Sequence, residues 1–138
     1  MRDLPRQLSE DELAELFSGR TRLVAELARR EDPLAVAEEV AAGLPELDQA
    51  AALAAHPRIG EASEEQRGDE PEVLAELDEL NRAYEEKFGF RFVVFVAGRT
   101  RRELVPILRQ RLTRTREEEL ETGLRDLLAI ARDRWIRT

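Results

Sequence analysis

Helix-start signals are the feature of this sequence that most constrains its fold. Three times a Ser or Thr is followed three residues later by Glu, just before a run of helix-forming residues. In this arrangement, the capping box, the hydroxyl accepts a hydrogen bond from the third helical N–H, and the Glu side chain accepts one from the N–H of the cap. Each pair therefore predicts a helix N-terminus. The pairs are Ser9 with Glu12, Thr100 with Glu103, and Thr115 with Glu118.

Prolines and glycines divide the rest of the chain into further helices. Proline favours the first turn of a helix, and glycine favours the position just past its end. The 138 residues suit one domain, and 42% of them are hydrophobic. We therefore expect residues 1–138 to form a single all-α domain, a bundle of about seven to nine helices. One further predicted helix begins near Thr21. The others run from Asp32–Pro33 to Gly43, from Pro45 to His56, and from Pro71 to Gly89.

One segment departs from the helical pattern. Residues 88–96 read Phe-Gly-Phe-Arg-Phe-Val-Val-Phe-Val and contain all but one of the five phenylalanines. Aromatic and β-branched residues in such a run favour a buried strand. No second strand candidate exists in the sequence, and a lone strand would leave backbone groups without hydrogen bonds. One solution is an extended segment threaded between helices, with some of its backbone groups facing a ligand.

The charge balance bears on the partners of the chain. A formal net charge of -8 argues against nucleic acid as the main partner, because binding to phosphates needs a concentrated basic face. An anionic small molecule would need a local arginine cluster. No stretch approaches the ~20 apolar residues of a membrane span. The N-terminus has no apolar signal-peptide core, so we expect a cytoplasmic protein with no membrane partner.

His56 is the only histidine, and the chain has no cysteine. Imidazole is the only side chain whose ordinary pKa lies near neutrality, so His56 is the first candidate for proton transfer. The alternative is a helix-ending histidine that interacts with the last helical carbonyls. Without cysteine or a second histidine, a metal site is not expected.

Two further sets of polar residues have both a functional and a purely structural interpretation. Glu64, Glu65 and Gln66 form either a solvated acidic face or a carboxylate and an amide that turn toward His56. Arginines crowd the apolar segment and the C-terminus. Most arginines in such a chain only cover helix surfaces, but one or two could bind a carboxylate or ureido oxygen through the guanidinium.

Several motifs occur in one order along the chain. They are Ala-His-Pro-Arg-Ile-Gly at 55–60, Glu-Gln at 65–66, Asn-Arg-Ala-Tyr-Glu-Glu-Lys-Phe-Gly-Phe at 81–90, Phe-Val-Val-Phe-Val-Ala-Gly-Arg at 92–99, and Ile-Ala-Arg-Asp-Arg at 130–134. From about residue 8 to its C-terminus, the chain resembles the decarboxylases of 2-oxo-4-hydroxy-4-carboxy-5-ureidoimidazoline (OHCU). These enzymes catalyse the last step from urate to allantoin.

The resemblance implies an all-helical, cofactor-free and commonly dimeric enzyme that acts on a small molecule. It implies that His56 is the catalytic acid/base, with Pro57 beside it, and that Glu65 lies near the hydroxyl and carboxylate of the substrate. It also implies a set of substrate-binding residues. These are Ser63, Gln66, the backbone of Phe92, Val93, Val94, Phe95 and Val96, and Arg134.

Two departures from the family pattern accompany the resemblance. Only eight residues separate His56 from Glu65, where the family leads us to expect a longer insert, and Ser63 lies two residues before Glu65 instead of three. Two other functions therefore stay open. One is a related enzyme for another ureido or imidazole compound, and the other is a non-catalytic helical binding module.

Overall fold

The computed structural model describes residues 7–58 and 71–137, and within these ranges the chain forms helices and no strands. This confirms the predicted all-α class. The helices are α1 (Glu10–Leu16), α2 (Arg22–Leu27), α3 (Ala37–Ala42), α4 (Glu46–Ala54), α5 (Pro71–Phe88), α6 (Arg101–Arg111) and α7 (Arg116–Arg137).

The predicted capping boxes begin helices. Ser9 and Thr100 each make both reciprocal hydrogen bonds, at the starts of α1 and α6. Thr115 and Glu118 make the same pair of bonds before α7, at 3.0 and 3.1 Å. These bonds satisfy N–H groups that have no partner within the helix, which explains why the helices begin at these residues.

The helix predicted from Asp32–Pro33 is wrong in its first turn. The carbonyl of Asp32 accepts hydrogen bonds from the N–H groups of Ala35 and Val36, at 3.1 and 3.3 Å, so a local turn does form. The backbone then leaves helical geometry at Val36, with φ -109° and ψ 13°, and α3 begins only at Ala37. An isolated turn and a helix start share the same sequence signal, because both use Pro after a capping residue.

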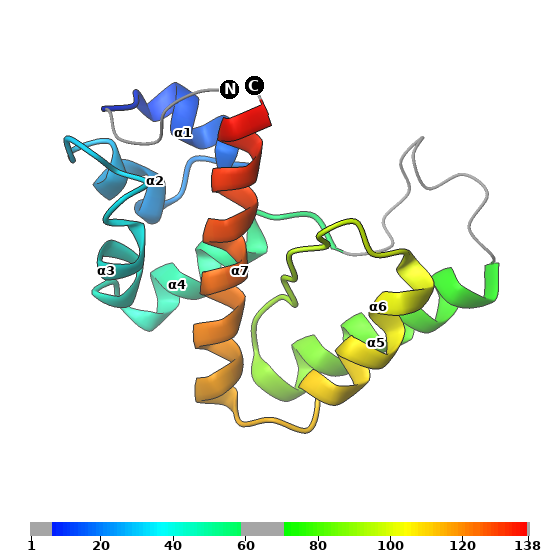
Figure 1. The fold of residues 1–138 in the computed structure, drawn as a ribbon. Helices are drawn as coiled ribbons and strands as arrows, with labels where there is room; N and C mark the ends of the chain where they lie inside the picture. Colours follow the sequence, from blue (N-terminus) through cyan, green and yellow to red (C-terminus); the bar gives the residue numbers. More distant parts are fainter. Residues whose placement is uncertain (1–6, 59–70, 138) are drawn as a thin grey trace.

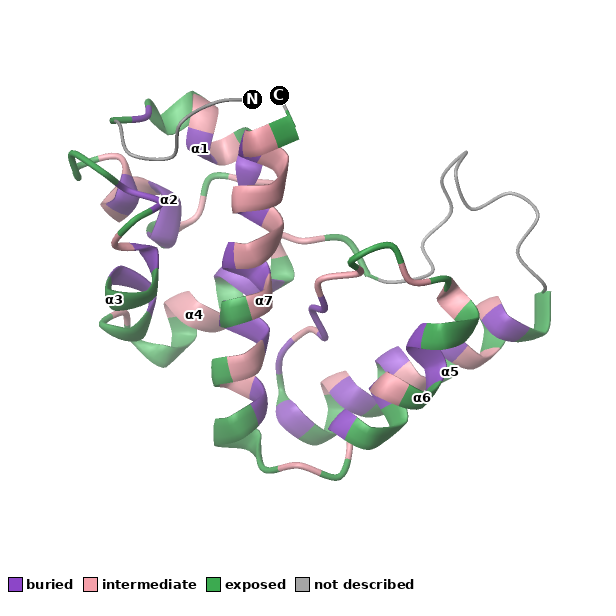
Figure 2. Ribbon diagram, in the orientation of Figure 1, coloured by how far each residue is buried: buried purple, intermediate pink, exposed green. Residues whose placement is uncertain are grey.

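Helix α7 lies at the centre of the fold (Figure 1). It contacts α1, α3 and α4; in this view α1 and α3 lie on one side of it and α4 crosses behind it, while α5 and α6 pack against each other on the other side. Residues 89–100, which connect α5 to α6, run between α7 and the α5–α6 pair. The buried faces of the helices point toward α7 and toward this connection (Figure 2).

Aromatic side chains fix the connection on its core side. The ring of Tyr84 lies 4.6 Å from that of Phe88, 5.9 Å from Phe90 and 5.1 Å from Phe92, centroid to centroid. Such clusters stabilise a core beyond the area that they bury. Residues 91–96 have no regular secondary structure. The strand-like sequence thus forms a segment threaded between helices, whose phenylalanines anchor it in the core.

The helices do not include a membrane span. In residues 7–58 and 71–137, no helix is both long enough and apolar enough to cross a bilayer.

Candidate functional site

His56 lies two residues beyond the last residue of α4, and its backbone is held in place. The amide of His56 donates to the carbonyl of Leu53 at 3.1 Å. Arg91 Nη1 donates to the carbonyls of Ala54 and His56, at 2.7 and 2.8 Å. A guanidinium at this end complements the partial negative charge of the helix C-terminus. The backbone that carries the half-buried imidazole is therefore held in one position.

The turn that follows His56 is tied to α5. Arg58 donates from Nε and Nη2 to the two carboxylate oxygens of Glu85, at 2.6 and 2.9 Å. The bidentate geometry fixes direction as well as distance. The hydrogen bond from Arg58 holds the pKa of Glu85 below its usual range. Two of the sequence motifs, the one at 55–60 and the one at 81–90, thus meet through this ion pair.

A cavity of about 460 Å³ opens beside His56. Three parts of the chain line it: the end of α4, the connection between α5 and α6, and the last turns of α7. A volume of this order is enough for a small-molecule ligand. The lining residues are His56, Val94, Phe95, Val96, Ala97, Gly98, Ile130, Asp133, Arg134 and Arg137.

Arg134 links the cavity to α1. Its Nη1 donates to the carbonyl of Leu16 and to Ser18 Oγ, each at 2.8 Å. Burial lowers the pKa of Arg134 below that of an exposed arginine. The guanidinium is thus a half-buried cation, anchored at the C-terminus of α1 and exposed to the cavity.

The cavity wall formed by the connection ends in a tight turn. Arg99 N donates to the Val96 carbonyl at 3.0 Å, and the two central residues have positive φ, 52° at Ala97 and 79° at Gly98. This is the pattern of a type I′ turn. The Arg99 side chain folds back and donates to the carbonyls of Phe95 and Val96, at 2.6 and 2.9 Å.

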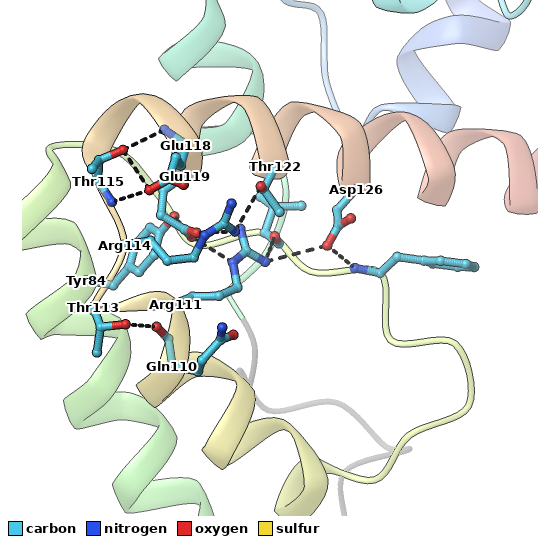
Figure 3. Close-up of polar contacts among 12 residues, drawn as sticks. Tyr84, Gln110, Arg111, Thr113, Arg114, Thr115, Glu118, Glu119, Thr122 and Asp126 are labelled. Carbon is cyan, nitrogen blue, oxygen red and sulfur yellow. Dashed lines mark hydrogen bonds and ion pairs between the residues drawn. The ribbon is translucent and has the colours of Figure 1, made fainter.

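A buried polar network holds the other side of the connection (Figure 3). Arg111 and Glu119 are 4% and 0% exposed, and Arg111 Nε donates to Glu119 Oε1 at 2.7 Å. The Tyr84 hydroxyl donates to the same oxygen at 2.7 Å. Burial, and then the Glu119 carboxylate, raise the pKa of Tyr84 above its ordinary value. Buried charges need such partners, since an unpaired ion in the core is strongly unfavourable.

The structure brings together part of the predicted site. His56, Val94, Phe95, Val96 and Arg134 all line the cavity. Phe92 and Val93 are buried in the core, each 1% exposed, and the Phe92 ring packs against Tyr84. Pro57 is exposed beside His56. Ser63, Glu65 and Gln66 lie outside the described residues.

Some lining residues were missed at the level of sequence. Ile130 lies one turn before Arg134 on α7, so helical spacing from Arg134 was the signal that could have found it, while Arg137, one turn after Arg134, is among the C-terminal arginines considered in the sequence. Asp133 pairs with Arg137, with 2.9 Å between Oδ2 and Nε. Among the described residues, no three His, Asp or Glu side chains lie close enough together to bind a metal ion.

Comparison with known proteins bears on the family and the fold of the chain. The sequence profile of the OHCU decarboxylase family matches residues 2–135. A crystal structure of an OHCU decarboxylase in the presence of (S)-allantoin is similar, with 24% identity, a TM-score of 0.78, and coverage of 91% of this chain and 96% of that one. A crystal structure of (S)-allantoin synthase has 20% identity and a TM-score of 0.71, and the match covers 93% of this chain and 48% of that one. No match was found among the curated proteins.

The two structural similarities show the fold, and the profile match over almost the whole chain shows the family. The class is that of all-helical carboxy-lyases acting on a small molecule. This chain belongs to the OHCU decarboxylase family, whose members act in urate degradation and yield allantoin.

Proposed function

We propose that this chain decarboxylates OHCU to (S)-allantoin in the cavity beside His56, without a cofactor. The single observation that carries the assignment to this cavity is that His56 and the half-buried Arg134 line it together with residues 94–96. It is the arrangement that a small anionic ureide requires: a proton donor, a cation and amide groups.

The reaction needs little from the protein beyond orientation, exclusion of water and one proton. The bond between the ring carbon and the carboxylate breaks, CO2 leaves, and the electron pair moves into the adjacent C=N system. The hydroxyl on the ring carbon that lost CO2 gives up its proton to become the ring carbonyl, and a proton must reach the neighbouring ureido-bearing carbon from one face to give a single enantiomer. An imidazole is suited to this step because its ordinary pKa lies near neutrality, and we assign the step to His56.

Arg134 binds the carboxylate or a carbonyl oxygen of the substrate in this proposal. Charge complementarity is stronger in a half-buried site than at an exposed one, because solvent screens it less. The chain as a whole carries a net charge of -8, so an anionic substrate needs such a local cation.

The backbone of the connection supplies the ureide contacts. Val94, Phe95 and Val96 line the cavity, so their peptide groups are the candidates. The carbonyls of Val93, Phe95 and Val96 and the amide of Phe95 already bond to side chains of the protein. Among the peptide groups of residues 94–96, this leaves the amide and carbonyl of Val94 and the amide of Val96, and we assign the two groups of Val94 to the ureido group or ring of the ligand.

Three proposed residues fall in the segment between His56 and α5. We propose that Glu65 lies near the hydroxyl and carboxylate of the substrate, that Gln66 binds the ring or the ureido group, and that Ser63 contributes a hydrogen bond. This assignment rests on the family resemblance of the sequence alone. We also propose that residues 1–138 form one domain and that the protein is cytoplasmic. We further propose that it is a homodimer, and sedimentation analysis of the purified protein tests this oligomeric state.

Freshly generated OHCU gives the direct test of the proposed function. The purified protein, treated with a chelator, should accelerate the loss of OHCU over the rate in buffer and should give optically active (S)-allantoin. Arg134→Met should raise the KM, whereas Arg125→Met on the exposed face of α7 should leave turnover unchanged. Loss of OHCU at the buffer rate, with racemic allantoin as the product, would overturn the proposal.

A further inference from the structure

We infer that Asp126 and Arg111 are positioning residues that turn both polar groups of Val94 toward the ligand cavity. Neither residue lines the cavity, so neither can bind the ligand itself. The inference rests on the proposed function for the identity of the ligand. The orientation of the Val94 peptide groups, by contrast, follows from the contacts alone.

Arg111 and Asp126 hold the two peptide bonds that flank Val94 from the same side (Figure 3). Arg111 Nη1 donates to the Val93 carbonyl at 3.0 Å. The Phe95 amide donates to Asp126 Oδ2 at 3.2 Å. That same oxygen lies 3.5 Å from Arg111 Nη1, so the two holding groups are neighbours.

The planar geometry of trans peptides determines in which direction the amide and the carbonyl of Val94 point. Within one trans peptide the C=O and the N–H point in opposite directions, and the described chain has no cis peptide bond. Because the Val93 carbonyl points to Arg111, the Val94 N–H points away from it. Because the Phe95 amide points to Asp126, the Val94 carbonyl points away as well.

The result is a donor and an acceptor side by side on a residue that lines the cavity. Val94 is 3% exposed, and neither its amide nor its carbonyl bonds to another described residue. Buried backbone groups without partners are rare in proteins, which favours a ligand as their partner. An adjacent N–H and C=O complement a group that carries an acceptor beside a donor, as the amide of a ureide or of an imidazolone does.

Arg111, one of the two holding groups, is itself held by several contacts. Arg111 donates to the fully buried Glu119 and stacks over the Phe92 ring, with 4.6 Å from its guanidinium carbon to the ring centroid. Arg114 also donates to Glu119, at 2.9 Å. The network therefore holds the backbone of the connection in one position. This explains why the network lies next to a segment that has no partner strand.

Variants of Asp126 test the inference through the split between KM and kcat. Asp126→Ala removes the acceptor of the Phe95 amide, and we expect the KM for OHCU to rise about 10-fold while kcat changes less than about 3-fold, because the contact is equal in ground and transition states. Asp126→Asn keeps an oxygen acceptor and should restore the KM to within about 3-fold of the wild type. Glu121→Ala is the matched control, since it removes an exposed carboxylate of the same helix that pairs with Arg125 and not with the connection.

A second readout does not depend on catalysis. In the wild type, the Val94 amide resonance should shift when (S)-allantoin is added, and the Phe95 amide should exchange its hydrogen slowly. In Asp126→Ala, Phe95 exchange should accelerate and the allantoin-induced shift at Val94 should shrink. If Asp126→Ala does not fold, Asp126→Glu, which displaces the carboxylate by one methylene, replaces it in both measurements.

The two proposals fail in different ways. Wild-type protein that neither turns over OHCU nor binds allantoin overturns the proposed function, and the exchange of Phe95 then decides on the positioning role alone. Active protein in which Asp126→Ala retains the wild-type KM and the wild-type Phe95 exchange overturns the positioning role.

Discussion

Arginine side chains that donate to backbone carbonyls shape the site at the scale of single residues. Arg91 holds the end of α4 beside His56, and Arg99 holds the cavity wall at Phe95 and Val96. The bonds of Arg91 span 35 and 37 residues of sequence, so no local pattern could have indicated them. His56 and Arg134, by contrast, could be singled out from the sequence, because one is the only histidine and the other matches a family motif.

The turn at Ala97–Gly98 gives a stability prediction at this scale. Gly98 has φ 79°, and a Cβ added to it would meet no atom within 4 Å, so backbone strain alone decides the cost of alanine there. Gly98→Ala should lower the free energy of unfolding by about 1–2 kcal/mol in urea titrations.

Gly43→Ala provides the control for this substitution. Gly43 closes α3 at φ -82°, which alanine adopts readily, and its added Cβ would approach only to 3.4 Å from the Glu39 carbonyl oxygen. This variant should change the free energy by less than about 0.5 kcal/mol. Equal losses in both variants would show that strain at the cavity turn is not the cause.

The Arg58–Glu85 pair predicts a pH dependence. The pKa of Glu85 is lower in the folded protein than in the unfolded chain, so the pair stabilises the fold above the ordinary pKa of a glutamate. That contribution is lost as the pH falls through the lowered pKa of the folded state. Glu85→Gln should cost about 1 kcal/mol at pH 7, and the difference from the wild type should shrink below about pH 4.

Urea titrations between pH 7 and pH 3 measure this difference. Glu79→Gln is the control, because Glu79 lies on the exposed face of α5. A deficit of Glu85→Gln that persists undiminished at pH 3 would contradict the account.

At the scale of elements, helix starts were the most predictable feature. Ser9, Thr21 and Thr100 cap α1, α2 and α6 as their sequence patterns indicate, because capping is a contact between residues only three apart. The start of α3 was predicted wrongly at Asp32–Pro33. The strand-like run at 88–96 was predicted to lack a partner strand, with an extended segment threaded between helices as one solution. Residues 91–96 do lack regular secondary structure, but no local pattern indicates the side chains that hold them.

The buried network between α5, α6 and α7 yields a prediction for the elements that it joins. Tyr84→Phe keeps the ring in its aromatic cluster but removes the hydroxyl that donates to Glu119, and it should cost about 1.5–3 kcal/mol. Glu119→Gln should cost more, about 3–5 kcal/mol, because the buried Arg111 then loses the carboxylate that it bonds at 2.7 Å and keeps only Asp126, at 3.5 Å.

Chemical denaturation of the two single variants and of the double variant checks the network. The Tyr84 hydroxyl donates to the same Glu119 carboxylate oxygen that Arg111 bonds, so the effects of Tyr84→Phe and Glu119→Gln should not add. Additive losses, or a Glu119→Gln variant as stable as the wild type, would contradict the role given to the network.

At the scale of the whole molecule, the cavity is assembled from parts that lie far apart in the sequence. His56, residues 94–98 and the last turns of α7 meet there because α7 runs through the centre of the fold (Figure 1). Arg134 adds the C-terminus of α1 through Leu16 and Ser18. Tertiary packing sets this convergence, so sequence patterns could identify members of the site but not its complete lining.

The most direct test of the central claim is the rate and the stereochemistry of product formation by His56→Asn. Asparagine keeps a polar side chain that can donate and accept hydrogen bonds but cannot transfer a proton near neutral pH. With freshly generated OHCU, the account predicts a fall in kcat of about 100-fold or more and loss of the optical activity of the allantoin formed. Unfolding in urea should show that the variant remains folded. A folded His56→Asn variant that forms (S)-allantoin at the wild-type rate would contradict the account.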